Sequence, residues 1–76
     1  MKKIQILGTG CAKCIKLTEH AREAAEEAGV AYEIEKVTDL NKIMDFGVMM
    51  TPALAIDGEV KSVGKVLSVE EIKKLL

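Results

Sequence analysis

The chain has 76 residues, the size of one small domain, and we expect residues 1–76 to form a single domain. Its 11 basic and 12 acidic residues give a net charge of −1 and are spread along the chain, which argues against binding to nucleic acid or anionic lipid. No apolar run approaches the ~20 residues of a membrane span, and the amino-terminal apolar stretch is too short for a signal peptide. We therefore expect a mature cytoplasmic protein.

The first segments predict a strand followed by a helix. Residues 2–7 alternate in polarity, with Ile4 and Ile6 on one face, and the pattern ends at Gly8. Small and apolar residues then recur at spacings of three and four, which predicts a helix that ends near Gly29. These residues are Cys14, Leu17, Ala21, Ala24, Ala25 and Ala28.

A second strand and a short helix are predicted next. Residues 30–37 alternate again in polarity, as expected of a strand. Either Thr38 or Asp39 can cap a short helix over residues 39–46, and Gly47 would stop it.

The next segment predicts a β-hairpin. Residues 52–56 are apolar and are followed by Asp57 and Gly58, the pair of residues that most strongly favours a tight hairpin turn. Residues 59–63 would then form the returning strand.

The chain is predicted to end on a capped helix. Ser68, with Glu71 three residues later, forms a capping-box pattern before a helix over the last residues. The predicted fold class is α/β, with the order β-α-β-α-β-β-α and a mixed four-stranded sheet flanked by three helices. The first two strands should be parallel, because a helix joins them, and the last two antiparallel.

The two cysteines, Cys11 and Cys14, are three positions apart at the start of the first predicted helix. At this spacing the Cβ atoms lie about 5 to 6 Å apart, close enough for a disulfide after a small adjustment. Gly10, Ala12 and Lys13 would form the helix start, whose backbone N–H groups, dipole and lysine charge stabilise a thiolate at Cys11. Position therefore predicts Cys11 as the nucleophile and Cys14, on the apolar face, as the shielded resolving thiol.

A soft-metal carrier for copper or zinc is the main alternative for this cysteine pair. The pattern CxxC after a first strand also resembles the heavy-metal-associated domain of copper chaperones, and Met49 and Met50 could act as soft ligands. Zinc, however, needs about four ligands, and His20 would lie on another side of the helix from both cysteines. Those metal domains also end on a strand, whereas a capped helix is predicted here, so we expect no metal site.

Two other interpretations of this segment remain open. Both cysteines could be small buried apolar residues, although the Gly-Thr-Gly approach and the helix start argue against that. The sequence GTGCAK also matches part of the dinucleotide-binding pattern GxGxxG, but Lys13 occupies the third glycine position and the domain is too small. We therefore expect no bound cofactor.

The CxxC helix, followed about 40 residues later by MTPAL at a strand start, resembles the thioredoxin fold. The chain is similar over essentially its whole length to small archaeal and bacterial thioredoxin-like proteins, also called redox-active disulfide proteins. This resemblance implies that Cys11 attacks and Cys14 resolves. It also implies that Pro52 is a cis proline facing the cysteines and that the backbone of Thr51 pairs with a partner.

The sequence departs from the thioredoxin pattern WCGPC at three points. Ala12 and Lys13 replace the Gly-Pro pair, Gly10 replaces the tryptophan, and the first strand has no acidic residue to match the buried aspartate of thioredoxin. The predicted function is nevertheless that of a monomeric thiol-disulfide oxidoreductase. Its expected partners are disulfide-containing proteins and a protein reductase.

The single histidine and three of the methionines also carry predictions. His20 is expected on the solvated outer face of the first helix. Met44, Met49 and Met50 are expected mainly to fill the core, with a soft apolar collar around the disulfide as the alternative.

Overall fold

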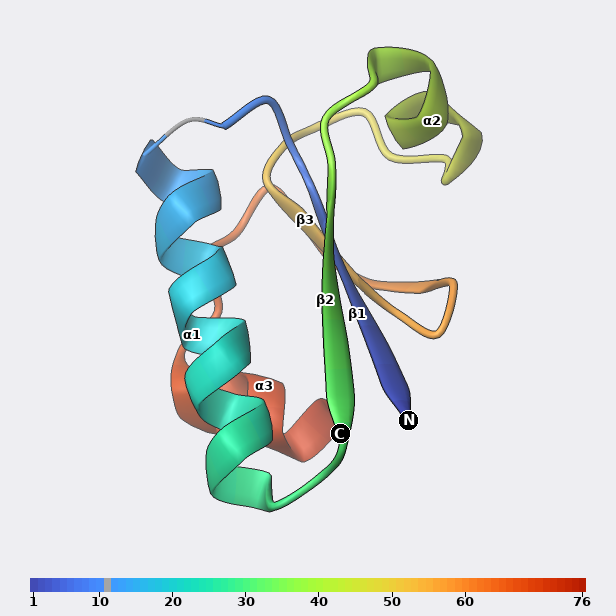
Figure 1. Cartoon of the computed structure of the whole chain (residues 1–76). Helices are drawn as coiled ribbons and strands as arrows, with labels where there is room; N and C mark the ends of the chain where they lie inside the picture. Colours follow the sequence, from blue (N-terminus) through green and yellow to red (C-terminus); the bar gives the residue numbers. More distant parts are fainter. Residues whose placement is uncertain (11) are drawn as a thin grey trace.

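The computed structural model describes residues 1–10 and 12–76 and is shown in Figure 1. Within these residues the chain forms four strands and three helices in the order predicted from the sequence, and the fold class is thereby confirmed. The elements are β1 (Lys2–Leu7), α1 (Ala12–Ala28), β2 (Tyr32–Val37), α2 (Leu40–Asp45), β3 (Ala53–Ile56), β4 (Glu59–Val63) and α3 (Val69–Leu75).

The strands form one mixed sheet in the order β2-β1-β3-β4. Strand β1 is parallel to β2, as expected for strands joined through a helix, and antiparallel to β3. Strands β3 and β4 form the predicted antiparallel hairpin. Because Leu7 pairs with Ala53, the end of β1 and the start of β3 meet at one edge of the sheet. Gly8 and Pro52 therefore lie at the same edge.

The helices cover the two faces of the sheet unequally. Helices α1 and α3 lie together on one face, whereas the short α2 lies toward one end of the sheet (Figure 1). The larger core packs α1 and α3 on the sheet and contains Ile4, Ile6, Leu17, Ala21, Ala24, Ala25, Leu54 and Ile72. The smaller core, with α2, contains Leu7, Val37, Ile43, Val48 and Ala53. Burying each large aliphatic side chain contributes about 1.5 to 3 kcal/mol, so both cores stabilise the fold substantially.

The end of α1 is set by the predicted glycine. Gly29 has a φ of 70°, a conformation that costs glycine little. Its N–H donates to the Glu26 carbonyl over 3.2 Å, and the Val30 N–H donates to the Ala25 carbonyl over 3.3 Å. These two bonds form a Schellman motif, which satisfies carbonyls at the end of the helix.

The two shorter helices begin at capping residues that the sequence indicates. At α2 the cap is Asp39, whose Oδ1 accepts a hydrogen bond of 2.8 Å from the Asn41 backbone N–H. At α3 the capping box is complete, because Ser68 accepts from the Glu71 N–H and the Glu71 carboxylate accepts from the Ser68 N–H. Both caps satisfy backbone donors that the helix itself leaves unpaired.

The prediction that His20 is solvated on the outer face of α1 is wrong. The residue is half-buried, and its Nδ1 lies 2.8 Å from the Leu67 carbonyl oxygen, to which it donates a hydrogen bond. The segment that leads into α3 packs against this side of α1, so the histidine joins two parts of the fold that are remote in sequence.

The prediction that the three methionines fill the core is also wrong. Met44, Met49 and Met50 are 68%, 97% and 62% exposed. Helix α2 has only six residues and places Ile43 in the smaller core, where Val48 joins it from the following loop. The neighbouring methionines are left on the surface.

Among the described residues, no helix has the length and the apolar character needed to cross a bilayer.

The turn of the β3-β4 hairpin is held by Asp57. Asp57 and Gly58 have φ values of 54° and 84°, as a type I′ turn requires. The Asp57 carboxylate accepts a hydrogen bond of 2.9 Å from the Lys3 backbone N–H, and the Asp57 N–H donates to the Lys3 carbonyl over 2.8 Å. This backbone hydrogen bond, together with the nearby Lys2 charge, lowers the pKa of Asp57. The turn is therefore tied to the first strand.

We predict that Asp57→Asn reduces the acid sensitivity of folding. Because folding lowers the pKa of Asp57, its contribution is complete above the unfolded-state pKa and is lost as pH falls through the folded-state pKa. Asparagine tolerates a positive φ, so the variant removes the charge without straining the turn. Urea unfolding at neutral and acid pH should show a smaller loss of stability for the variant than for wild type. Asp45→Asn, at an exposed position of α2, is the matched control, and an acid loss in Asp57→Asn equal to that of wild type would contradict the prediction.

Candidate functional site

The candidate site lies where the end of β1, the start of α1 and the start of β3 come together. Gly8, Thr9 and Gly10 lead from β1 toward α1, and Gly10 has a φ of 87° that favours glycine. Ala12 and Lys13 form the exposed start of α1. The predicted nucleophile, Cys11, lies outside the described residues.

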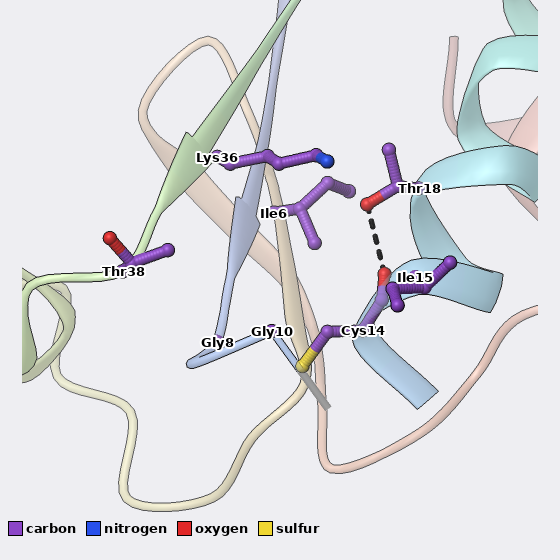
Figure 2. A pocket seen from close by; sticks show the side chains of 8 residues that line it. All are labelled: Ile6, Gly8, Gly10, Cys14, Ile15, Thr18, Lys36 and Thr38. Atoms are coloured by element: carbon purple, nitrogen blue, oxygen red, sulfur yellow. Dashed lines mark hydrogen bonds between the residues drawn. The ribbon is translucent and has the colours of Figure 1, made fainter. Parts of the chain in front are cut away.

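Cys14 is buried in the first turn of α1, with only 5% of its surface exposed. It shares the buried face of the helix with Leu17 and Thr18. Figure 2 shows its sulfur directed toward the connection at Gly8 and Gly10. The Thr18 hydroxyl donates a hydrogen bond of 2.9 Å to the Cys14 carbonyl oxygen, one turn back along the helix. The burial predicted for Cys14 from its position on the apolar face is confirmed.

Gly8 provides the space that the Cys14 sulfur occupies. A Cβ atom at position 8 would overlap the Cys14 Sγ, and it would lie 3.4 Å from the Cys14 Cβ and 3.9 Å from the Pro52 Cα. Cys14 and Pro52 therefore both lie close to Gly8. Sequence reasoning took Gly8 as the end of a strand and as part of the Gly-Thr-Gly approach to the helix, because the pattern of one strand does not reveal what packs against it.

Pro52 is fully buried, and the Thr51-Pro52 peptide bond is cis. The Pro52 carbonyl accepts a hydrogen bond of 2.8 Å from the Gly64 N–H, which joins this loop to the segment after β4. Thr51 is exposed beside it. The structure thus places buried Pro52 next to Cys14 and exposed Thr51 at the surface.

An apolar surface lies next to Thr51. The exposed side chains of Leu40, Met44 and Met49 line a shallow hollow, and Thr51 forms part of its wall. Met50 lies nearby, with its side chain packed against Gly64. Met44, Met49 and Met50 therefore lie around the loop that precedes Pro52.

A small cavity of about 30 Å³ lies between the sheet and the start of α1. Its walls include Cys14 and Thr18 from α1, Ile6 from β1 and Lys36 from β2 (Figure 2). Sequence reasoning did not select Lys36. The alternation of residues 30–37 places it on the helix-facing side of the strand, but only the pairing of Ile6 with Lys36 brings it toward Cys14.

Of the residues considered as metal ligands, Cys11 lies outside the described part of the chain. No group of three or more His, Cys, Asp or Glu side chains that could hold a metal occurs there. His20 donates its Nδ1–H to the Leu67 carbonyl oxygen.

We predict that Gly8→Ala displaces the Cys14 sulfur, because the added methyl group needs the same space. Forcing extra volume into a packed site costs about 1 to 3 kcal/mol, which urea unfolding would measure. Cys14→Ala is the matched background, since it removes the sulfur that the methyl group meets. In the Cys14→Ala background, Gly8→Ala should lower the free energy of unfolding much less than it does in wild type. An equal decrease in both backgrounds would contradict the contact.

Comparison with known proteins agrees with this arrangement. A family model described as a thioredoxin domain matches residues 2–76. A thioredoxin of Methanothermobacter thermautotrophicus is 51% identical over 76 residues, which cover 100% of this chain and 99% of that protein. A thioredoxin of Methanocaldococcus jannaschii is 47% identical over 76 residues, which cover 100% of this chain and 87% of that protein. The chain therefore belongs to the thioredoxin family of protein disulfide oxidoreductases.

Proposed function

We propose that this protein exchanges disulfides with partner proteins through Cys11 and Cys14. The observation that carries the proposal is the burial of Cys14 at the start of α1, against Gly8 and beside Pro52. A thiol in that position is shielded from solvent but lies one helical turn from the position of Cys11 in the sequence. Membership of the thioredoxin family supports the same chemistry.

The proposed reaction has two exchange steps. The Cys11 thiolate attacks one sulfur of the partner disulfide, forms a mixed disulfide and releases the other partner sulfur as a thiolate. The Cys14 thiolate then attacks the Cys11 sulfur, closes the Cys11–Cys14 disulfide and releases the second partner thiolate. The protein dithiol loses two electrons and two protons, and the partner gains them as two thiols. A protein reductase would restore the dithiol by the same exchange in reverse.

The residues around the cysteines have distinct proposed roles. Gly10, Ala12 and Lys13 would support the Cys11 thiolate at the amino end of α1, where backbone N–H groups and the helix dipole favour negative charge. Thr51 would bind the extended backbone of the partner, and Pro52 would hold that loop against Cys14. Both assignments are supported by the exposure of Thr51 and the burial of Pro52.

The apolar surface beside Thr51 would contact the partner chain next to its disulfide. Methionine side chains are flexible and polarizable, so they adapt to different apolar side chains. Exposed Leu40, Met44 and Met49 therefore suit a protein that acts on several partners. A dithiol that must be regenerated operates in a reducing compartment, which makes the cytoplasm the proposed location.

The test is the reduction of insulin disulfides with dithiothreitol as the source of electrons. Wild type should accelerate the reaction, and Cys11→Ser should abolish the acceleration because the attacking thiolate is lost. Cys14→Ser should retain the first step and accumulate a mixed disulfide that mass spectrometry detects. Acceleration by Cys11→Ser equal to that of wild type would overturn the proposal.

We also predict that the two thiols react at different rates. Because Cys14 is 5% exposed, iodoacetamide should label Cys11 well before Cys14 in the reduced protein near neutral pH. Peptide mapping by mass spectrometry would measure the two rates, with the urea-unfolded protein as the control in which the difference disappears. Equal rates in the folded protein would remove the proposed division of roles.

A further inference from the structure

We infer that Met44 and Met49 form a site of oxidation by hydroperoxides, and that their sulfoxides weaken the docking of partner proteins while the cysteine chemistry continues. The inference rests on the proposed function and deepens it, because it adds a modification that controls the access of protein substrates to the same site. The modification changes the surface beside Thr51 and leaves Cys11 and Cys14 as they are.

Both methionines are exposed because the residue before each of them is buried. Ile43 in α2 and Val48 in the following loop are 3% and 5% exposed, and they hold this part of the chain on the smaller core. The next residue in each case is left at the surface, so Met44 is 68% exposed and Met49 is 97% exposed. A small peroxide can therefore reach both side chains in the folded protein.

The two side chains lie on one hollow. The Gly47 N–H donates a hydrogen bond of 2.8 Å to the Met44 carbonyl oxygen, which turns the chain at the end of α2 and brings Met49 back toward the helix. The hollow that both line has a volume of about 630 Å³, within the range of roughly 300 to 1,000 Å³ for binding pockets. Thr51, just before the buried Pro52, forms part of its wall. A partner chain that binds at Thr51 therefore lies next to both methionines.

The other two methionines are placed differently. Met50 is 62% exposed, but its Sδ lies 3.6 Å from the position that a Cβ atom at Gly64 would occupy, so its thioether packs on the loop after β4. Met50 is not among the described residues that line the hollow. Met1 is 85% exposed and lies at the opposite end of the sheet from α2 (Figure 1). Met1 is therefore an internal control, an exposed methionine remote from the site.

The oxidation transfers two electrons from the thioether to the hydroperoxide. The O–O bond breaks, one oxygen atom forms an S–O bond with the methionine sulfur, and the hydroperoxide is reduced to an alcohol, or to water when it is hydrogen peroxide. The methionine sulfur loses the two electrons that the peroxide gains. The product is a polar sulfoxide in place of a flexible apolar side chain.

A sulfoxide interferes with docking because the hollow offers it almost no hydrogen-bond partner. Of the described residues that line the hollow, Thr51 alone has a polar side chain. Water solvates the sulfoxide oxygen in the free protein, and a partner that covers the hollow removes this water without replacing its hydrogen bonds, which is unfavourable. The hollow shares no described residue with the cavity beside Cys14, so the exchange reaction at the cysteines is not altered.

The test treats the protein with hydrogen peroxide while the two cysteines are held as their disulfide, which protects them. Peptide mapping by mass spectrometry measures the sulfoxide at each methionine. Dithiothreitol then opens the disulfide again, whereas a methionine sulfoxide needs a dedicated reductase. Treated wild type should reduce insulin about tenfold more slowly than untreated wild type, because the partner has to cover two polar groups. The rate at which the reduced, desalted protein reacts with bis(2-hydroxyethyl) disulfide, which is too small to cover the hollow, should stay the same.

Met44→Leu together with Met49→Leu is the matched variant, because leucine is similar in size, forms helix as readily and has no sulfur to oxidise. Each protein is compared with itself before treatment, so a change in starting activity caused by the substitutions cancels. The double variant should keep its insulin activity after the same treatment, although Met1 and Met50 are still oxidised. Met49→Gln gives a second measurement, because it places a polar amide on the hollow without any peroxide. It should slow insulin reduction more than it slows the reaction with the small disulfide.

The following results would overturn the inference and leave the proposed function intact. Wild type that carries both sulfoxides could keep its full insulin activity, or could lose no more activity than the double variant loses. Treatment could also slow the reactions with insulin and with the small disulfide equally, or leave Met44 and Met49 unmodified after Met1 is fully oxidised. Failure of untreated wild type to accelerate insulin reduction would instead overturn the proposed function, and this inference with it.

Discussion

The packing of the Cys14 sulfur against the backbone at Gly8 is the contact on which the candidate site depends. No side chain larger than hydrogen fits at position 8 without displacing that sulfur, so the Cys14 side chain packs directly on the backbone that follows β1. The pairing of Leu7 with Ala53 then brings the start of β3 to the same edge of the sheet. As a result the buried thiol lies close to Pro52, although the two residues are remote in sequence.

A resolving thiol, the role proposed for Cys14, has to meet two opposing requirements. Burial protects Cys14 from solvent and from unrelated oxidants, and it also disfavours the thiolate form that exchange needs. In thioredoxin itself a buried aspartate lies near this site, whereas here the apolar residue Ile6 lies on the helix-facing side of β1 and Lys36 lies opposite it.

The order and type of the elements could be predicted from the sequence because their signals are local. Gly29 ends α1, Asp57 and Gly58 form the hairpin turn, and Ser68 with Glu71 begins α3, as predicted. The helix signals are satisfied by backbone groups a few residues away, and the hairpin turn follows from the local preference of Asp-Gly for positive φ, so no knowledge of remote contacts is needed. The buried position of Cys14 followed in the same way from helical spacing.

The sequence-based predictions fail for residues that are surrounded by segments far away in the sequence. His20 bonds to the Leu67 carbonyl, and nothing within α1 indicates that this segment packs there. The exposed position of Met49 depends on how little surface the short α2 covers, which hydrophobicity alone does not reveal. The sequence by itself determined the elements and the CxxC spacing of Cys11 and Cys14. Only the tertiary structure decided that Gly8, Pro52 and Lys36 surround Cys14, because strand pairing and helix packing join residues that no local pattern connects.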